Sequence, residues 1–292
     1  MIINQAALSG IYKSFKTIFG EAFAGAPSVF ERIATVVPSA GREVTYAWLG
    51  AFPQLREWLG DRVIANLKAS DYTIKNKDFE ATVAVPRNDI EDDQIGVWRP
   101  MIDGLAVAAK QHPDYLVFSL LAAGFTTLCY DGQYFFDTDH PVGGASVSNH
   151  GGGSGTPWYL LCTKRPIKPL VFQSRKPPQF VSMDRTDDES VFMRKEFRYG
   201  VDYRANVGFS LWQLAYGSKQ TLDATNYAAA RAAVMSFKDD QGRPLGLVPD
   251  LLVVPPTLES AGRILLENER DAAGATNPWK GTAELLVSPW LA

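Results

Sequence analysis

YTIKNKDFEATVAV (Tyr72–Val85) carries the clearest strand pattern in the sequence. Tyr72 and Ile74 alternate with polar residues, and a polar run, Lys75–Asp78, follows them. Because alternation with a period of two residues is typical of half-buried strands, the stretch predicts a two-stranded hairpin that turns at Lys75–Asp78. The apolar residues that alternate on the returning strand are Phe79, Ala81, Val83 and Val85.

A hairpin of this kind is incomplete by itself. Isolated hairpins are marginally stable in water and need a third strand or a packing surface. The following segment does not supply one, since Pro86 ends the second strand and an acidic loop up to Asp93 comes next. Either a distant part of the chain or a neighbouring molecule covers the apolar face, and we favour the neighbour. The residues expected to contact it are Tyr72, Ile74, Phe79 and Val83.

The segment from Asn4 to Ala24 predicts an amphipathic helix. Its apolar residues recur at intervals of three and four, Asn4 is placed to cap the first turn, and Gly25–Pro27 ends the helix. The apolar stripe belongs either to the core of its own subunit or to an arm that docks on another chain, because a linker rich in proline, glycine and serine follows. In the second case the contact residues are Leu8, Ile11, Phe15 and Phe19.

The longest predicted helix spans Ile95–Gly124. Pro100 suits its first turn, where no amide donor is needed, whereas Pro113 is expected to break or kink the helix, which would then have two pieces. The other segments before residue 222 predict a strand at 44–50, a short helix at 54–64, glycine-rich loops at 129–157 and strands within 158–218.

From Leu222 onward the sequence predicts a small α/β unit. Asp223 caps an alanine-rich helix, and Asp250–Val254 is a continuous apolar strand. Thr257 then caps a second helix, and Leu285–Val287 supplies one more strand.

Composition places the chain among ordinary globular proteins. It has 292 residues, of which 46% are apolar and 21% charged, and a net charge of −3. These values exclude disordered and coiled-coil proteins and the basic stripe of a duplex-binding protein. The longest uncharged run, Tyr115–Tyr130, is too short and too mixed to span a membrane, and no secretory signal is visible. We therefore expect a soluble intracellular protein in which Cys129 and Cys162 are reduced and buried.

Metal chemistry has one candidate in the sequence. FFDTDHP places Asp137, Asp139 and His140 close together, and carboxylate and imidazole groups are ligands of Mg²⁺, Mn²⁺ and Zn²⁺. Aspartates in such turns more often bond their own backbone. His150–Gly153 is similar to an oxyanion-hole run, but the sequence lacks the nucleophile motif G-x-S-x-G that this chemistry requires.

Two blocks of opposite charge lie between residues 164 and 189. Separated patches of opposite sign suit contacts between copies of one chain, but they can equally be an ordinary solvated surface. The alternating basic and aromatic residues of Phe192–Arg204 could bind single-stranded nucleic acid, although a strand explains them with fewer assumptions. The basic block contains Lys164, Arg165, Lys168, Arg175 and Lys176, and the acidic block contains Asp184, Asp187, Asp188 and Glu189.

Four strings together resemble the major head (capsid) subunit of Mu-like tailed bacteriophages: LREWLGDR (Leu55–Arg62), YTIKNKDFEATVAVPRNDIEDD (Tyr72–Asp93), CYDGQYFFDTDHP (Cys129–Pro141) and GVDYRANVGFSLWQLAYGS (Gly200–Ser218). The resemblance covers nearly the whole chain and implies an α+β fold of the Hong Kong 97 type. By this analogy residues 1–40 form an N-terminal arm, and 41–93 carry the extended loop. Residues 94–221 form a peripheral domain with the spine helix and the long strands, and 222–292 form an axial-type domain.

The resemblance also implies a structural protein and not an enzyme. Copies of the chain would assemble as hexamers and pentamers into an icosahedral head shell around double-stranded DNA, which is held without sequence-specific binding and without cofactors. The implied partners are a scaffold or protease, a portal, and minor or decoration capsid proteins, with no membrane. Assembly would take place in the cytoplasm of the bacterial host. The alternatives are a cellular encapsulin-like shell protein and a metal-dependent hydrolase at Asp137, Asp139 and His140.

Overall fold

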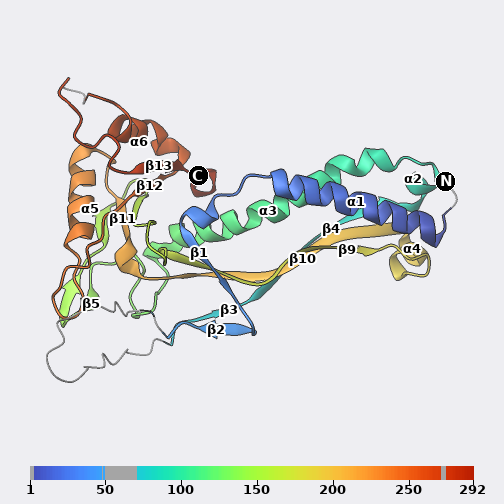
Figure 1. Ribbon diagram of the computed structural model, residues 1–292, viewed down its shortest axis with the longest axis horizontal. Coiled ribbons are helices and arrows are strands. Elements are labelled where there is room, and N and C mark those ends of the chain that lie inside the picture. Colours follow the sequence, from blue (N-terminus) through green and yellow to red (C-terminus); the bar gives the residue numbers. More distant parts are fainter. Residues whose placement is uncertain (1–2, 48, 50–70, 271–273) are drawn as a thin grey trace.

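The computed structural model describes residues 3–47, 49, 71–270 and 274–292. The molecule is elongated (Figure 1). Two long helices, α1 (Gln5–Gly25) and α3 (Arg99–Ala122), lie side by side over one face of a long sheet. A second sheet, with helices α5 (Ala224–Ser236) and α6 (Glu259–Leu266), forms the other end. This combination of helices and sheets agrees with the predicted α+β class.

The long sheet has the strand order β1-β9-β10-β4. Its centre is an antiparallel pair, β9 (Leu170–Met183) and β10 (Glu196–Phe209). β1 (Ala34–Pro38) pairs with β9 in parallel, and β4 (Lys77–Pro86) pairs with β10 in antiparallel register. The sheet therefore joins segments that are separated by more than a hundred residues in the sequence.

The predicted hairpin at Tyr72–Val85 is wrong. β3 (Thr73–Lys75) pairs with β2 (Glu43–Thr45), not with β4, so the chain continues through Lys75–Asp78 without turning back. The reason lies in Asn76, which is buried. Its backbone amide donates to the carbonyl of Arg42, and its side-chain amide donates to Gly41.

The partner of the second strand is a distant part of the same chain. Phe79 lies opposite Tyr203 and Val83 lies opposite Tyr199 in the β4–β10 ladder. The predicted alternation on this strand is confirmed, because the four apolar residues are more buried than the polar residues between them. The ribbon is thus completed inside the subunit by a segment that follows it by more than a hundred residues.

Both long helices agree with their sequence signals except at Pro113. The side chain of Asn4 caps α1 by accepting from the amide of Ala7, and Pro100 lies in the first turn of α3. Of the break or kink expected at Pro113, the break is wrong, because α3 is continuous. Packing holds it on both sides of the proline: Ile102 belongs to a cluster with α1, and Val117 belongs to the central core.

The second sheet has the order β13-β12-β8-β11-β7. Three of these five strands precede residue 222: β7 (His150–Gly153), β8 (Trp158–Leu161) and β11 (Ala215–Lys219). They join β12 (Leu251–Val254) and β13 (Glu284–Val287). The division between the two sheets therefore does not coincide with the boundary expected at residue 221, because β9 and β10 leave the second sheet after β8 and the chain returns to it at β11.

The helix expected from Thr257 begins later, since Pro256–Leu258 is a 3-10 turn before α6. Asp223 caps α5 as predicted, by accepting from the amide of Asn226. The helix expected at 54–64 lies outside the described residues. Of the strand expected at 44–50, Val44 and Thr45 belong to β2, and residues 48 and 50 lie outside the described residues. The remaining described helices and strands are α2 (Arg87–Glu91), α4 (Glu189–Arg194), β5 (His140–Val142) and β6 (Ala145–Val147). Further 3-10 turns are Phe30–Arg32, Ile95–Trp98, Ala123–Phe125, Trp212–Leu214 and Pro289–Leu291.

Within the part of the chain that the structure describes, no helix combines the length and the apolar character needed to cross a lipid bilayer.

Candidate functional site

The apolar stripe of α1 is buried in its own subunit. Leu8, Ile11, Phe15 and Phe19 belong to one cluster with α3 and the long sheet. The ring of Phe15 meets the edge of Tyr199 at a centroid distance of 4.9 Å, and Phe19 lies 5.2 Å from Phe180. This placement agrees with the first of the two interpretations of the helix, a core element of its own subunit. Contact of these residues with a second subunit stays a prediction.

The ribbon residues are divided between two cores. Ile74 is buried in the central core, where the hydroxyl of Tyr72 accepts a hydrogen bond of 2.9 Å from the amide of Phe209. Phe79 stacks on Tyr203 at 5.1 Å. Val83 packs against the same cluster as the α1 stripe. The structure thus brings Val83 and the α1 residues together, but the four ribbon residues do not form one exposed surface.

The three residues of the metal candidate do not form one cluster. The carboxylate of Asp137 accepts from the amides of Tyr134 and Thr138, which is the turn role that aspartates commonly have. Asp139 is exposed, whereas His140 is fully buried and stacks on Trp212 at 4.0 Å.

His140 instead meets two residues that sequence reasoning missed. Its Nδ1 atom lies 2.7 Å from a carboxylate oxygen of Asp131, and the thiol of Cys129 donates to the other oxygen at 3.0 Å. These three side chains are the one group of potential metal ligands found among the described residues. Both distances are hydrogen-bond lengths, and a proton at each contact accounts for them. Burial raises the pKa of the Cys129 thiol, and the charge of Asp131 raises it further, so the thiol keeps its proton.

Asn149 fixes the other side of the imidazole. Its side-chain amide donates to the carbonyl of Phe135 at 2.8 Å and lies within hydrogen-bond distance of two more carbonyls, from Trp212 and Ala215. Its Oδ1 atom therefore faces Nε2 of His140, at 3.2 Å, as an acceptor. Both ring nitrogens of His140 thus face oxygen atoms, which hold the ring between Asp131 and Asn149. The cluster ties the 129–150 loops to the second sheet.

Lowering the pH is expected to destabilise the subunit through Asp131. Burial by itself would raise the pKa of Asp131, but hydrogen bonds from His140 and Cys129 outweigh it and hold the pKa below its usual value. A carboxyl pKa that is lower in the folded chain adds stability above the unfolded value, about 4, and this stability is lost as the pH falls through the folded value. Urea unfolding of the unassembled subunit from about pH 6 to about pH 3 measures the loss. Asp131→Asn should reduce this pH dependence, and an unchanged dependence in the variant would contradict the assignment.

The glycine run His150–Gly153 has a packing role. It forms β7, which lies along β11. Gly153 has a positive φ of 89°, and a Cβ atom at this position would lie 2.4 Å from the backbone of Lys219. Only glycine allows this close approach, so packing explains the run without oxyanion chemistry.

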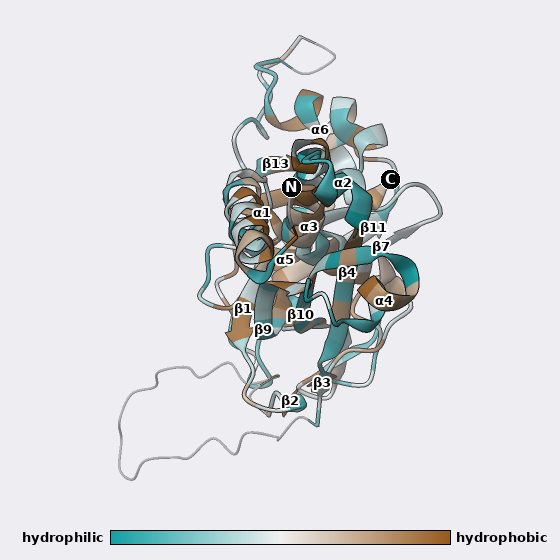
Figure 2. Ribbon diagram, turned by 90° about the vertical axis from the view of Figure 1, so that its right-hand side faces the viewer, coloured by the Kyte–Doolittle hydropathy of each residue, from teal (hydrophilic) through white to brown (hydrophobic). Residues whose placement is uncertain are grey.

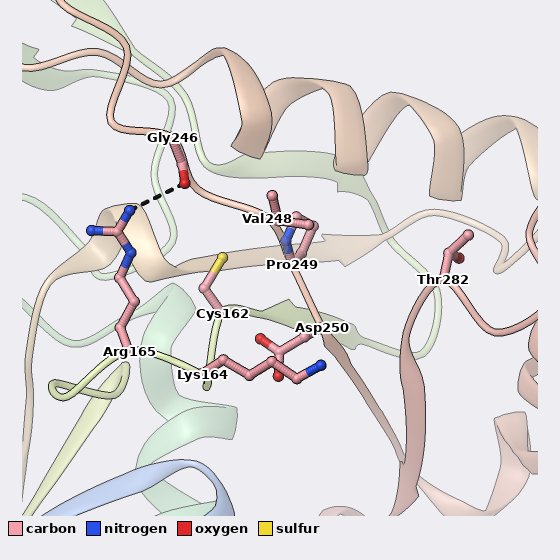
Figure 3. A pocket seen from close by; sticks show the side chains of 8 residues that line it. All are labelled: Cys162, Lys164, Arg165, Gly246, Val248, Pro249, Asp250 and Thr282. Carbon is pink, nitrogen blue, oxygen red and sulfur yellow. Dashed lines mark hydrogen bonds between the residues drawn. The ribbon is translucent and has the colours of Figure 1, made fainter.

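A hollow of about 260 Å³ lies beside β8 and β12 (Figure 3). Two of its charged groups are engaged by the chain itself: Arg165 donates to the carbonyls of Leu245 and Gly246, and Asp250 accepts from Thr163. The lining includes no histidine, and burial raises the pKa of its thiol, Cys162, to about 12. The hollow therefore lacks the paired nucleophile and base of a hydrolase.

The two charge blocks are not uniform patches. Lys176 pairs with Asp202 at 2.6 Å, and Arg175 donates to the carbonyl of Ser39. In the acidic block, Asp187 pairs with Arg185 at 3.2 Å. These contacts favour the interpretation of the basic block as surface that the chain uses for its own structure.

One part of the segment 158–218, which was expected to form strands, is helical instead, because Glu189–Arg194 forms the helix α4. Burial of Ser190 and Val191 turns the next two residues, Phe192 and Met193, outward to solvent. Sequence reasoning missed this exposed pair. The available signal is two large apolar residues between an acidic run and a basic pair, which is unusual for a core strand.

Comparison with known proteins gives full-length matches. Residues 8–291 match the family described as "Mu-like prophage major head subunit gpT". The chain is 41% identical, over 305 aligned positions that cover all of both chains, to the major capsid protein of Escherichia phage Mu.

Solved structures agree with these matches. The subunit in the procapsid of bacteriophage JBD30 is 47% identical and superposes with a TM-score of 0.88, covering 99% of this chain and 100% of that one. The subunit in the JBD30 capsid decorated with minor capsid protein trimers is 37% identical, with a TM-score of 0.80 and 92% of each chain covered. The predicted resemblance and fold class are confirmed by this similarity.

Proposed function

Because the chain belongs to the family of Mu-like prophage major head subunits, we propose that its copies assemble as hexamers and pentamers into an icosahedral shell that encloses double-stranded DNA. The observation that carries the proposal is the full-length agreement with a procapsid subunit, at a TM-score of 0.88. Shell formation is a structural role, and no catalytic step is proposed for the chain.

The charge of the chain supports a container and not a DNA-binding protein. Tight binding to duplex DNA depends on many lysine and arginine contacts with phosphates, whereas the net charge here is −3. In the long sheet, Arg204 pairs with Asp78 at 2.6 Å and Lys176 pairs with Asp202. Cations that are paired in this way bind phosphate groups only weakly, which suits DNA that is packed and later released.

The two sheets suggest a revised division into domains. We assign α1, α3 and the long sheet to the peripheral domain, and the second sheet with α5 and α6 to the axial-type domain. β2 and β3 begin the extended loop that the resemblance implies.

The partners are part of the same proposal. By analogy with the decorated JBD30 capsid, trimers of a minor capsid protein would bind the finished shell. A scaffold or protease and a portal would act during assembly in the cytoplasm of the bacterial host. The mature location of the chain would be the virion.

The purified chain, or the chain expressed with its scaffold, is expected to form closed particles of uniform diameter in negative-stain electron microscopy. Nuclease-resistant DNA inside particles from infected or induced cells would support a phage head, whereas an enzyme cargo would support the encapsulin-like alternative. Stoichiometric metal in the purified chain, lost in His140→Ala, would favour the hydrolase alternative. A chain that stays monomeric under all these conditions would contradict the proposal.

A further inference from the structure

The strands β2 and β3 form a pair that is too small to hold its own position. Each strand has three residues, and the two form a separate sheet. Because two-stranded sheets are marginally stable in water, the position of the pair depends on what it packs against. Figure 1 and Figure 2 both show it on the side of the long sheet away from α1 and α3. The chain enters the segment 46–72 from β2 and leaves it into β3, so whatever holds the pair directs both ends of that segment.

One buried side chain of the long sheet holds the pair. Gln173, in β9, is fully buried. Its Oε1 atom accepts from the hydroxyl of Tyr46 at 2.9 Å, and its amide nitrogen donates to the carbonyl of Ile74 at 3.0 Å and to Oδ1 of Asn76 at 2.8 Å. Gln173 therefore bonds both the residue that follows β2 and residues in and after β3, and both of its amide hydrogens are used.

Asn76 extends this network to the segment before β2. Its side-chain amide donates to the hydroxyl of Ser39 at 3.0 Å and to the carbonyl of Gly41 at 2.9 Å. The four side chains of the network, here called the Gln173 clamp, are at most 6% exposed: Ser39, Tyr46, Asn76 and Gln173. Hydrogen bonds in such a buried network are stronger than exposed ones and require a defined direction of approach.

Apolar packing places the pair against the sheet but does not account for a buried glutamine. Ile74 is 4% exposed and fills the space beside Gly208 of β10, where a Cβ atom would lie 2.7 Å from Cγ1 of Ile74. Hydrophobic contact is non-directional, and an apolar side chain at position 173 would serve it equally well. A buried amide costs free energy unless its hydrogen bonds are made. The contribution of Gln173 is therefore the direction of the pair and not its burial.

We propose that Gln173 is a positioning residue that fixes the angle at which β2 and β3 leave the long sheet. The inference rests on the proposed function, because this angle matters for assembly only if the extended loop that β2 and β3 begin takes part in the shell. Identical copies in a closed shell must present that loop in matching directions, so an error in the angle is repeated in every copy. Loss of the clamp therefore changes the shape and uniformity of the particles.

The test is Gln173→Met in the full chain, with Gln213→Met as the matched control. Methionine has about the length of glutamine but cannot make the hydrogen bonds of the clamp. Gln213 is buried as well, at 6% exposure, but its side chain accepts from the hydroxyl of Tyr130 instead. Both variants lose a buried amide group, so a general loss of stability appears in both.

Hydrogen exchange of the unassembled subunit measures the clamp directly. The backbone amides of Tyr46 and Asn76 make hydrogen bonds at the two ends of the β2–β3 pair. We expect both amides to exchange at least tenfold faster in Gln173→Met, because local opening of the pair becomes easier, while the amides of the β9–β10 ladder keep their rates. Gln213→Met should leave the exchange at these two positions unchanged, and equal rates in all three proteins would overturn the proposal.

Electron microscopy measures the effect on assembly. Gln173→Met should reduce the fraction of closed particles of uniform diameter at least tenfold, in favour of open or irregular particles, and Gln213→Met should not. Uniform closed particles from Gln173→Met would overturn the proposal, and so would irregular particles from both variants, which would trace the defect to lost stability. Failure of the unchanged chain to form any particles would instead overturn the proposed function, and the assembly role of the clamp with it. If Gln173→Met does not fold, Tyr46→Phe decides the question, because it removes one hydroxyl from the clamp and should also give irregular particles.

Discussion

Replacing Asn149 with leucine is expected to lower the free energy of unfolding of the subunit by about 3–9 kcal/mol, since each of three buried polar groups left without a partner costs about 1–3 kcal/mol. Asn149 is fully buried, and leucine has a similar size without the amide group. The substitution leaves three groups unpaired: the carbonyl of Phe135, the amide of Asp137 and Nε2 of His140. It also removes the acceptor that faces the imidazole, so the pair with Asp131 loses its support.

Urea unfolding of the unassembled subunit measures this loss directly. The control is Asn206→Leu, because the side chain of Asn206 makes one hydrogen bond, to the carbonyl of Lys75, near the surface. We expect the control to change stability by about 1 kcal/mol or less, the contribution of a single exposed hydrogen bond. Equal and small effects of the two substitutions would mean that Asn149 does not organise the 129–150 loops.

Sequence spacing in these loops does not predict which side chains contact His140. The string CYDGQYFFDTDHP contains every titratable member of the buried cluster, but spacing favours Asp137 and Asp139 as partners of His140 because they are closest in sequence. The structure selects Asp131 and Cys129, nine and eleven residues before it. The choice depends on which side chains the Trp212 ring and Asn149 enclose, and both belong to segments outside the string.

The strands give the same lesson at a larger scale. The alternation from Phe79 to Val85 predicted correctly which side chains face the interior. The alternation could not identify the pairing strand, because it shows which side chains face one side of a sheet but not which other segment of the chain lies next to them. β10 supplies ten paired residues from Glu196 to Ala205, and nothing in either segment alone specifies the other. The sequence therefore allowed a pairing strand in a neighbouring molecule. In the structure the pairing strand is β10 of the same chain.

Phe15→Ala is expected to lower the free energy of unfolding of the unassembled subunit by about 3–5 kcal/mol, the usual cost of removing a buried phenylalanine side chain. Phe15 is 1% exposed and packs edge-on against Tyr199. Its removal would leave a cavity between α1, α3 and the long sheet. Lys13→Ala, an exposed change on the same helix, is the control and should change stability by no more than about 0.5 kcal/mol.

The state in which this loss appears decides between the two interpretations of α1. If the helix belongs to its own subunit, the isolated subunit already contains the Phe15–Tyr199 contact, and its urea midpoint falls on substitution whether or not shells form. If α1 were an arm held by a neighbour, Phe15→Ala would leave the isolated subunit almost unchanged and would weaken only the assembled shell. Stability is therefore measured for the isolated subunit and for the assembled shell. Tyr199 can be covered by α1 of its own chain or by α1 of another chain. Only contact with its own α1 makes Phe15→Ala destabilise the isolated subunit.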